Sequence, residues 1–312
     1  MTKITKPTRD AFGDEMMALG EKIDNLYIVD VDVSKSMRTQ PFHEKYPEKA
    51  INVGIAEQCA GGIAAGLATT GKLPVISTYA VFGSMRMVEQ IRQSICYTNL
   101  NVKLACSHGG LTPANDGGSH QGIEDMGILR TIPNMKVIMG ADYNSTRKLV
   151  AAMMDDYGPT YIRFTRDAIP GIYDEDEEFE IGVAKKAKDG DDVTIIAVGD
   201  VLIFALRAAE ELENQGVSAR VLDMHTIKPL DNTAVLAALN ETKGIITVED
   251  HNIMNGLGSA VAEVVCENGG GIVKRVGIKD KFGESGPYDV LLAKNGITVE
   301  AIVDKAKDIV NS

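Results

Sequence analysis

The sequence predicts an α/β protein made of two doubly wound domains, each with a mostly parallel sheet. Short β-rich runs alternate with longer helix-periodic segments along the chain, as in parallel strands joined by helical crossovers. The alternation stops at an acidic, turn-rich segment around 170–192 and then starts again. The chain has 312 residues, which is enough for two hydrophobic cores of ordinary size.

The first domain is predicted to occupy residues 1–170. Its strands are expected in the aliphatic runs at 26–31, 73–78, 102–107, 135–140 and 160–165. Helical periodicity follows at 84–99 and 145–156. A further helix, rich in Gly and Ala, is expected to begin at Glu57.

Residues 171–190 carry an acidic run and are expected to form a solvated linker. A second, smaller α/β domain is predicted for residues 191–312, where the alternation resumes. Its strands are expected at 193–199, 219–224, 244–250 and 273–278. Its helices are expected near 201–215, 232–240 and 257–267.

Composition and charge narrow the classes of function. There are 32 basic and 44 acidic residues, a net charge of −12. This balance argues against nonspecific binding to nucleic acid or to an anionic membrane, because both need a cationic surface. The N-terminal residues lack the apolar core of a signal peptide, and the Gly- and Ala-rich stretch at 59–70 is too short to span a bilayer.

The cysteines show no C-x-x-C pairing, which fits a reduced, cytoplasmic protein. Each is expected to pack as a small buried hydrophobe, and the four are Cys59, Cys96, Cys106 and Cys266.

Glu57 is the first candidate for chemistry, because it lies in the first turn of a helix whose next residues are small. The helix N-terminus favours the ionised carboxylate and burial opposes it, so such a group can share a proton with a heterocyclic nitrogen. On the residues alone, a glutamate that satisfies the backbone amides of its own helix is the commoner explanation. Small side chains would let a ligand or a second backbone approach closely, and they are Ala60, Gly61, Gly62, Ala64, Ala65 and Gly66.

Polar candidates gather again in the Gly-rich segment "SHGGLTPANDGGSHQG" at 107–122. His108, Asp116 and His120 lie here, directly after a predicted strand. Open α/β sheets bind ligands at the carboxyl ends of their strands, so this segment is a candidate site.

The segment "NVGIAEQ" at 52–58 resembles the glutamate motif of thiamine diphosphate enzymes of the transketolase family. In that family the glutamate hydrogen-bonds a ring nitrogen of the aminopyrimidine and so activates the thiazolium of the coenzyme, which serves as the electron sink for C–C cleavage. The resemblance implies that Glu57 binds and activates thiamine diphosphate.

Two further segments resemble the same family. "DVDVSKS" at 30–36 is similar to the segment near the thiazolium and the substrate phosphate. The resemblance implies that Asp32 binds the coenzyme and that Ser36 binds the substrate near its phosphate. "STYAVFGSM" at 77–85 is similar to the segment whose aromatic side chains wall the pyrimidine, which implies that Tyr79 and Phe82 bind the coenzyme. Core packing is the alternative for these two rings.

The segment at 107–122 is similar to the transketolase loop with the pattern "H…D-G-P-T-H-Q". The resemblance implies that His120 donates to the ketose carbonyl or the C1 hydroxyl, while Asp116 reads the hydroxyl pattern at C2 and C3. It places His108 nearer to the far hydroxyls or the phosphate.

"IRFTRD" at 162–167 is similar to the strand that ends in a phosphate-binding arginine, which implies this role for Arg166. Arg163 is interpreted as a surface side chain.

Some positions differ from the pattern of the larger transketolases. Gly118 and Gly122 stand where proline is usual, Asn115 replaces an acidic residue, and Met85 replaces a further aromatic residue. These differences favour deoxyxylulose phosphate synthases and split transketolases, and they concern sugar specificity more than coenzyme use.

The family's other half supplies a G-D-G motif and a distal asparagine that hold Mg²⁺ and the diphosphate, and no such block is found in this sequence. The resemblance therefore implies the C-terminal subunit of a split, Mg²⁺-dependent transketolase that transfers a two-carbon ketol unit from a ketose phosphate to an aldose phosphate. An N-terminal partner subunit would carry the metal ligands, in an α₂β₂ assembly.

Other functions stay open as alternatives. The chain could belong to a deoxyxylulose phosphate synthase-like enzyme. It could also be the β subunit of a 2-oxoacid dehydrogenase E1, which has the same two-domain plan, or a non-catalytic subunit that keeps the fold. A nucleotide-binding Rossmann protein is disfavoured because no G-x-G-x-x-G follows an early strand.

Overall fold

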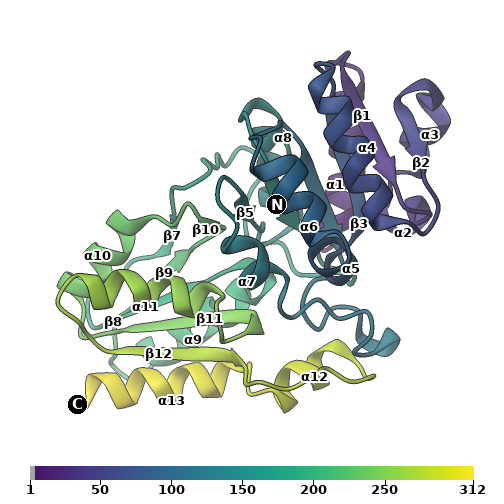
Figure 1. Cartoon of the computed structure of the whole chain (residues 1–312). Helices are drawn as coiled ribbons and strands as arrows, with labels where there is room; N and C mark the ends of the chain where they lie inside the picture. Colours follow the sequence, from purple (N-terminus) through teal and green to yellow (C-terminus); the bar gives the residue numbers. More distant parts are fainter. Residues whose placement is uncertain (1–3) are drawn as a thin grey trace.

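The computed structural model describes residues 4–312, which form two α/β domains, each built on its own sheet (Figure 1). The strand order is β10-β5-β6-β4-β3-β1-β2 in the first sheet and β12-β11-β8-β9-β7 in the second. The pairs β10–β5 and β7–β9 are antiparallel, and the other pairs of named strands are parallel. The predicted fold class is confirmed.

The elements of the first domain follow the predicted alternation. Its strands are β1 (Leu26–Asp30), β2 (Ala50–Asn52), β3 (Leu73–Tyr79), β4 (Lys103–Ser107), β5 (Lys136–Ile138) and β6 (Thr160–Arg163). Its α-helices are α1 (Thr8–Gly20), α2 (Ser34–Met37), α3 (Gln40–Lys45), α4 (Glu57–Thr69), α5 (Ala80–Met85), α6 (Val88–Gln90), α7 (Asp125–Arg130) and α8 (Tyr143–Asp155). Short helical turns are η1 (Pro47–Lys49), η2 (Ile91–Cys96) and η3 (Ala114–Asp116).

The second domain begins with an antiparallel edge strand. Its strands are β7 (Lys185–Lys188), β8 (Val193–Ala197), β9 (Ala219–Asp223), β10 (Thr226–Lys228), β11 (Ile245–Asn252) and β12 (Val273–Ile278). Its helices are η4 (Gly199–Val201), α9 (Leu202–Glu213), α10 (Asn232–Glu241), α11 (Leu257–Glu267), α12 (Tyr288–Lys294) and α13 (Val299–Val310). Strand β10 leaves this domain and pairs with β5 at the edge of the first sheet.

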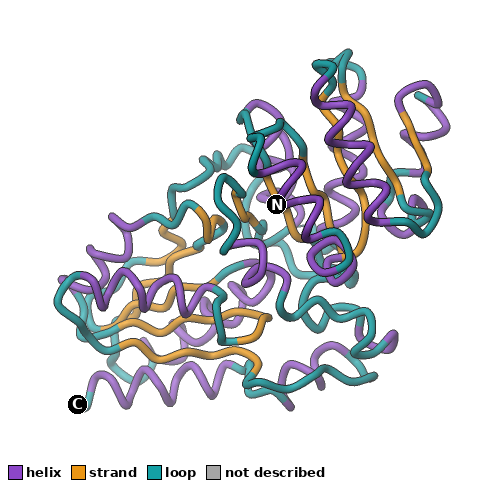
Figure 2. The backbone as a smooth tube through the Cα atoms, in the orientation of Figure 1, coloured by secondary structure: helices purple, strands orange, loops and turns teal. Residues whose placement is uncertain are grey.

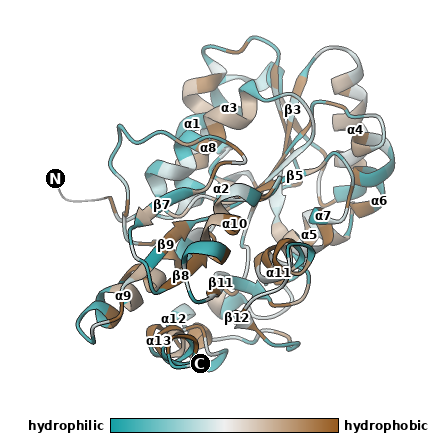
Figure 3. Cartoon of the chain, turned by 90° about the vertical axis from the view of Figure 1, so that its left-hand side faces the viewer, coloured by the Kyte–Doolittle hydropathy of each residue, from teal (hydrophilic) through white to brown (hydrophobic). Residues whose placement is uncertain are grey.

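Each sheet is covered on both faces, as Figure 2 shows for the helices around the strands. Successive strand residues point to opposite faces, so Ile28 and Val75 join the apolar cluster that contains α1 and α8. Val29 and Ile76 join the cluster that contains Ala60 of α4. In Figure 3 strands β8 and β9 are coloured as hydrophobic, as expected for strands that are buried on both faces.

The structure differs from the sequence prediction at several places. The single helix expected at 84–99 is divided into α5, α6 and the π-helical turn η2. Strand β7 lies inside the predicted linker, where Tyr173 and Phe179 are also buried. The interpretation of every cysteine as buried is wrong for Cys59 and Cys266, which are exposed, because each lies on the outward face of its helix.

No helix in the described part of the chain is both long enough and apolar enough to cross a membrane.

Asp223 makes the stability of the second domain depend on pH. Its carboxylate is fully buried at the end of β9 and accepts a hydrogen bond of 2.9 Å from the Tyr173 hydroxyl. Burial raises the pKa of Asp223 to about 8. A raised folded-state pKa stabilises the protein at low pH, and this stabilisation is lost as the pH rises towards 8.

The variant Asp223→Asn keeps the acceptor and cannot ionise. Its unfolding free energy relative to the wild type is therefore expected to increase between pH 5 and pH 9, by on the order of a few kcal/mol. Urea denaturation across this range measures the difference. Asp174→Asn, at an exposed carboxylate of the segment 171–190, is the matched control. An Asp223→Asn difference that stays constant with pH would contradict the prediction.

Candidate active site

Glu57 is the first residue of α4 and its side chain is buried, with 5% of its surface exposed. It borders an open cavity of about 520 Å³, which Ile55, Cys59 and Arg86 also line. Its Oε1 accepts a hydrogen bond of 2.9 Å from Arg86 Nη1. The carboxylate is thus held at the rim of a cavity, and its partner Arg86 is half exposed.

The small residues of α4 are used in two ways. A Cβ at Gly61 would come within 2.9 Å of Gln90, so this glycine allows close packing inside the domain. A Cβ at Gly62 or at Gly66 would meet only open space, and both positions face outwards. Part of the helix therefore presents a flat exposed surface beside Glu57.

A row of rings connects Glu57 with the segment at 107–122. The Arg86 guanidinium lies 3.9 Å from the centroid of Phe82, and Phe82 meets His120 edge to face at 5.5 Å. Tyr79 lies 5.8 Å from Phe82 and stacks on His108 at 3.9 Å between centroids. One face of Tyr79 is thus covered by His108, whereas Phe82 stands nearer to the Glu57 cavity.

Tyr79 also reaches a cationic pocket. Its hydroxyl donates to Ser36 Oγ at 2.9 Å, and Arg9 Nη1 donates to Ser36 O and Oγ at 3.1 and 3.3 Å. The pocket has about 540 Å³, and its lining includes Asp32 and Arg38. Such a pocket offers guanidinium and hydroxyl groups to an anion.

Sequence reasoning missed Arg9. An arginine in the first turn of a helix opposes the helix dipole, and Arg9 lies in the first turn of α1. That unfavourable placement is the signal that could have identified it.

His108 follows β4 directly and is almost fully buried in a left-handed conformation, with φ of 62°. Its Nδ1 lies 2.6 Å from Ser107 Oγ. Burial lowers the pKa of His108 to about 3, and the positive charges of Arg9 and Arg166 act in the same direction. The imidazole is therefore neutral at physiological pH and can donate or accept a hydrogen bond without carrying charge.

Asp116 and Arg166 face each other at 3.6 Å, and both side chains are about one-third exposed. Arg166 Nη1 also donates to the Pro113 carbonyl at 3.0 Å. His120 is partly buried, with Nδ1 3.0 Å from Ser119 Oγ. The loop presents the carboxylate of Asp116 and the imidazole of His120, and Arg166, which follows β6, adds a guanidinium beside Asp116.

Asp32 lies after β1 with a positive φ of 67°. Its backbone N–H donates to Asn52 Oδ1 at 3.0 Å, and the side chain lines the cationic pocket. Asp32, Ser36 and Tyr79 therefore line one pocket, and His108 stacks on its Tyr79. Glu57 lies at a second cavity, connected to the first through Arg86 and Phe82.

The interpretation of Arg163 as a surface side chain is wrong. Arg163 is 1% exposed and its Nε lies 3.6 Å from Asp125 Oδ2. Its Nη2 donates to the Asp250 carbonyl at 2.7 Å. The end of β6 is covered by the second domain, and this buries the side chain.

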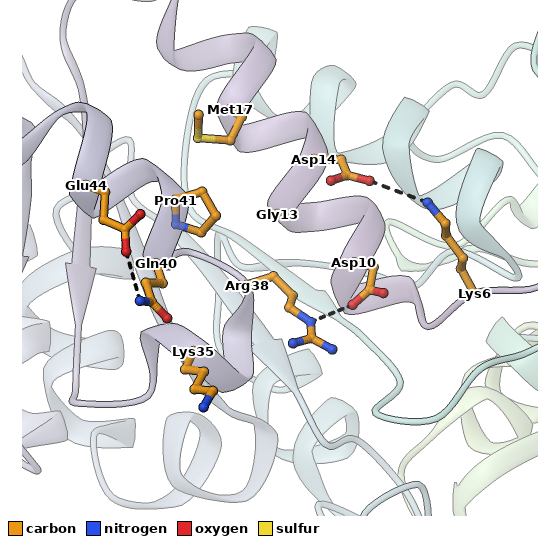
Figure 4. A pocket seen from close by; sticks show the side chains of 10 residues that line it. All are labelled: Lys6, Asp10, Gly13, Asp14, Met17, Lys35, Arg38, Gln40, Pro41 and Glu44. Carbon is orange, nitrogen blue, oxygen red and sulfur yellow. Dashed lines mark hydrogen bonds and ion pairs between the residues drawn. The ribbon is translucent and has the colours of Figure 1, made fainter.

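Another cavity lies between α1 and the α2–α3 region (Figure 4). It has about 570 Å³, but its charges are largely paired, as Arg38 with Asp10 at 2.7 Å and Lys6 with Asp14 at 4.0 Å. Among residues 4–312, no group of three or more His, Cys, Asp or Glu side chains is placed to hold a metal ion. The candidate site is therefore the one around Glu57 and His108.

Two family models match this chain. The model of the transketolase pyrimidine-binding domain matches residues 5–171, and the model of the transketolase C-terminal domain matches residues 182–302. The chain belongs to the transketolase family.

Relatives that match this chain over nearly the whole of both sequences define its place in the family more closely. A protein of Methanocaldococcus jannaschii named "Putative transketolase C-terminal section" is 42% identical, over 98% of this chain and 96% of its own length. A Clostridium protein named "6-deoxy-6-sulfo-D-fructose transketolase subunit SqwH" is 39% identical, over 96% and 94%. The solved structure titled "Split gene transketolase, inactive beta4 tetramer" is 42% identical with a TM-score of 0.90, over 98% of both chains. This chain thus corresponds to the C-terminal section of split transketolases.

Proposed function

We propose that this chain is the C-terminal subunit of a split, thiamine diphosphate-dependent transketolase that transfers a two-carbon ketol unit between sugar phosphates. The observation that supports this most directly is the buried Glu57 carboxylate at an open cavity, where it bonds Arg86, whose guanidinium lies over the face of Phe82. A buried carboxylate with an aromatic ring one side chain away fits a flat heterocycle with a basic ring nitrogen.

The coenzyme, when bound, supplies the electron sink for C–C cleavage and formation. Glu57 would hold the pyrimidine nitrogen and share its proton, while Phe82 would cover the pyrimidine face. Because Arg86 now bonds Glu57 and lies over Phe82, the pyrimidine would have to displace it. Tyr79 would complete the aromatic wall and, through its stacking contact, orient His108.

The sugar would lie along the segment at 107–122. His120 would donate to the ketose carbonyl or the C1 hydroxyl, and Asp116 would bind the hydroxyls at C2 and C3. His108, neutral at the working pH, would contact the hydroxyls farther along the chain. Ser36, Arg9 and Arg166 would bind the phosphate, and Asp32 borders the same pocket.

The pyrimidine half of the site needs a second half for the diphosphate. We expect an N-terminal partner subunit that carries the Mg²⁺ ligands, in an α₂β₂ assembly. The names of the relatives support a divided enzyme, since one is a "C-terminal section" and another a "subunit".

The test is ketol transfer by the chain alone and by the chain mixed with the partner subunit, with thiamine diphosphate and Mg²⁺. Activity is expected only for the mixture. Xylulose 5-phosphate is compared with pyruvate, because turnover of pyruvate would indicate a 2-oxoacid dehydrogenase instead. Full activity of the purified single chain would contradict the divided site.

A sulfonated donor belongs in the same assay, since one relative is named for 6-deoxy-6-sulfofructose. Phosphate and sulfonate are both oxyanions that a guanidinium can bind. Comparing the KM of phosphorylated and sulfonated donors therefore identifies the anion that the cationic pocket around Arg9 prefers.

The arginines should act mainly on binding of the sugar's anionic end. The variant Arg9→Met is expected to raise KM for phosphorylated donors by about 10- to 100-fold, because one charge-assisted contact to the phosphate is lost. The value of kcat should stay within about 3-fold of the wild type. A donor without phosphate should show little change in KM. Initial rates with both donors test this, and an equal loss for both would contradict a phosphate role. Lys22→Met, on an exposed side chain after α1, is the control.

A further inference from the structure

The segment at 107–122 is packed against the second domain as well as the first. It follows β4 in the chain, Figure 1 shows teal ribbon beside α12, and η3 of this segment contacts that helix. Gly286 N–H donates to the Ala114 carbonyl at 3.4 Å, and Gln121 Nε2 donates to the Glu284 carbonyl at 3.0 Å. The second domain therefore forms one wall of the loop that carries the candidate substrate residues.

The most buried of these contacts involves Asp250, at the carboxyl end of β11. Asp250 is 2% exposed, and its Oδ2 accepts hydrogen bonds from Leu111 N–H at 2.9 Å and from the Tyr288 hydroxyl at 3.1 Å. Leu111 is itself fully buried and lies three residues after His108. A single side chain of the second domain thus holds the backbone of the loop near the histidine.

Two glycines show how closely the loop lies on this side chain. A Cβ at Gly110 would come within 2.1 Å of Asp250 Oδ2, and a Cβ at Gly109 would come within 1.8 Å of Arg163 Nε. Gly110 also has a φ of +59°, which side chains other than glycine rarely adopt. The backbone between His108 and Leu111 is therefore seated directly on Asp250 and Arg163.

We propose that Asp250 of the C-terminal domain is a positioning residue for ketol transfer, which holds the loop of His108, Asp116 and His120 in register through Leu111 N–H. This inference rests on the proposed function of that loop. The second domain would then contribute to catalysis without touching substrate or coenzyme. A shift of about 1 Å in a catalytic group can cost on the order of 10²-fold in rate.

The acceptor oxygen, rather than the negative charge, carries this role. Burial, together with the neighbouring Asp200, raises the pKa of Asp250 to about 7, and in either protonation state the carboxyl offers Leu111 N–H an acceptor oxygen. Asp250→Asn can place its Oδ1 towards Leu111 and Tyr288, whereas Asp250→Ala leaves both donors without this partner. The two variants separate positioning from charge.

Glu249 offers a matched control on the same strand. It is also fully buried and accepts two backbone N–H groups, those of Leu257 and Gly258 at 2.7 and 2.9 Å. These lie within the second domain and not in the loop. Glu249→Ala therefore removes an equivalent buried acceptor without releasing Leu111.

The first arm of the experiment is hydrogen–deuterium exchange of the purified chain, read by mass spectrometry on peptides that contain Leu111. Asp250→Ala is expected to increase the exchange rate of this amide by at least about 10-fold, because the amide loses its one buried hydrogen bond to Asp250. Asp250→Asn and Glu249→Ala should match the wild type. Equal exchange in Asp250→Ala and the wild type would overturn the positioning contact, whatever the protein's activity.

The second arm is kinetics of the chain reconstituted with its partner. Asp250→Ala should lower kcat by about 10- to 100-fold while the Kd of thiamine diphosphate, measured by calorimetry, stays within about 3-fold, because Glu57 and Phe82 lie outside the loop. Asp250→Asn should restore kcat to within about 3-fold of the wild type. A loss of kcat that is equal in Asp250→Asn, or equal in Glu249→Ala, would overturn the proposal.

The two failures are distinguishable. An inactive wild-type complex would refute the proposed function, and the exchange arm would still decide whether Asp250 holds the loop.

Discussion

Glu57→Gln is expected to lower kcat for ketol transfer by the reconstituted enzyme by about 10²- to 10⁴-fold. This is the usual contribution of a positioned acid or base to the catalytic rate. The amide keeps the size and one acceptor of the carboxylate but cannot share a proton with a pyrimidine nitrogen. Because the side chain is buried at the first turn of α4, solvent cannot easily replace it.

The loss should appear in turnover more than in coenzyme binding. Glutamine can still accept or donate one hydrogen bond to the heterocycle, so the Kd of thiamine diphosphate should rise by no more than about 10-fold. Steady-state kinetics at saturating coenzyme and calorimetry measure the two quantities. Glu89→Gln, an exposed glutamate on the neighbouring helix α6, is the control. Wild-type turnover by Glu57→Gln would remove Glu57 from the chemistry.

The parts of the fold that the sequence predicted are those with strong local patterns. Strands β1, β3 and β4 are almost wholly buried and each contains a short apolar run, "IV" in β1, "VI" in β3 and "LAC" in β4, as expected for strands covered on both faces. Candidate residues follow such strands directly, as His108 follows β4 and Arg166 lies just beyond β6. Local sequence was therefore sufficient to find these strands and the positions that follow them, while the roles of the candidate residues stay predictions.

The parts that could not be predicted depend on distant partners. Strand β7 reads "KKAK" and is a strand because it pairs with β9. Strand β10 has three residues and pairs with β5 of the other domain. Neither segment has an apolar alternation of its own, so only the tertiary structure makes them strands.

Arg163 illustrates the same limit at a single residue. Arginine is seldom fully buried, and its position three residues before Arg166 gave no local sign of burial. Carboxylates near it come from elements distant in sequence, Asp125 on α7 and Asp250 on β11. Its environment is created when the second domain covers the end of β6.

Arg163→Met is therefore expected to lower the unfolding free energy of the chain by about 3–5 kcal/mol at pH 8, the usual cost of removing one partner from a buried ion pair. Methionine replaces much of the aliphatic volume, but Asp125 loses its cation at 3.6 Å and the Asp250 carbonyl loses a donor at 2.7 Å. Equilibrium urea denaturation measures the change.

The cost should be smaller at pH 6 than at pH 8. Burial already raises the pKa of Glu249 and that of Asp250 to about 7, and Arg163 acts against both shifts. Without the guanidinium these carboxyls would keep their protons to higher pH, so the variant loses more stability than the wild type as the pH rises through this range.

Arg166→Met is the matched control, with the same substitution three residues along the chain. Its ion pair with Asp116 is about one-third exposed on both sides, and such solvent-screened pairs contribute less than about 1 kcal/mol. If Arg163→Met costs no more than Arg166→Met, the buried guanidinium adds no net stability between the domains. A large cost that grows with pH would instead show that the second domain is held on the first by charge as well as by apolar packing.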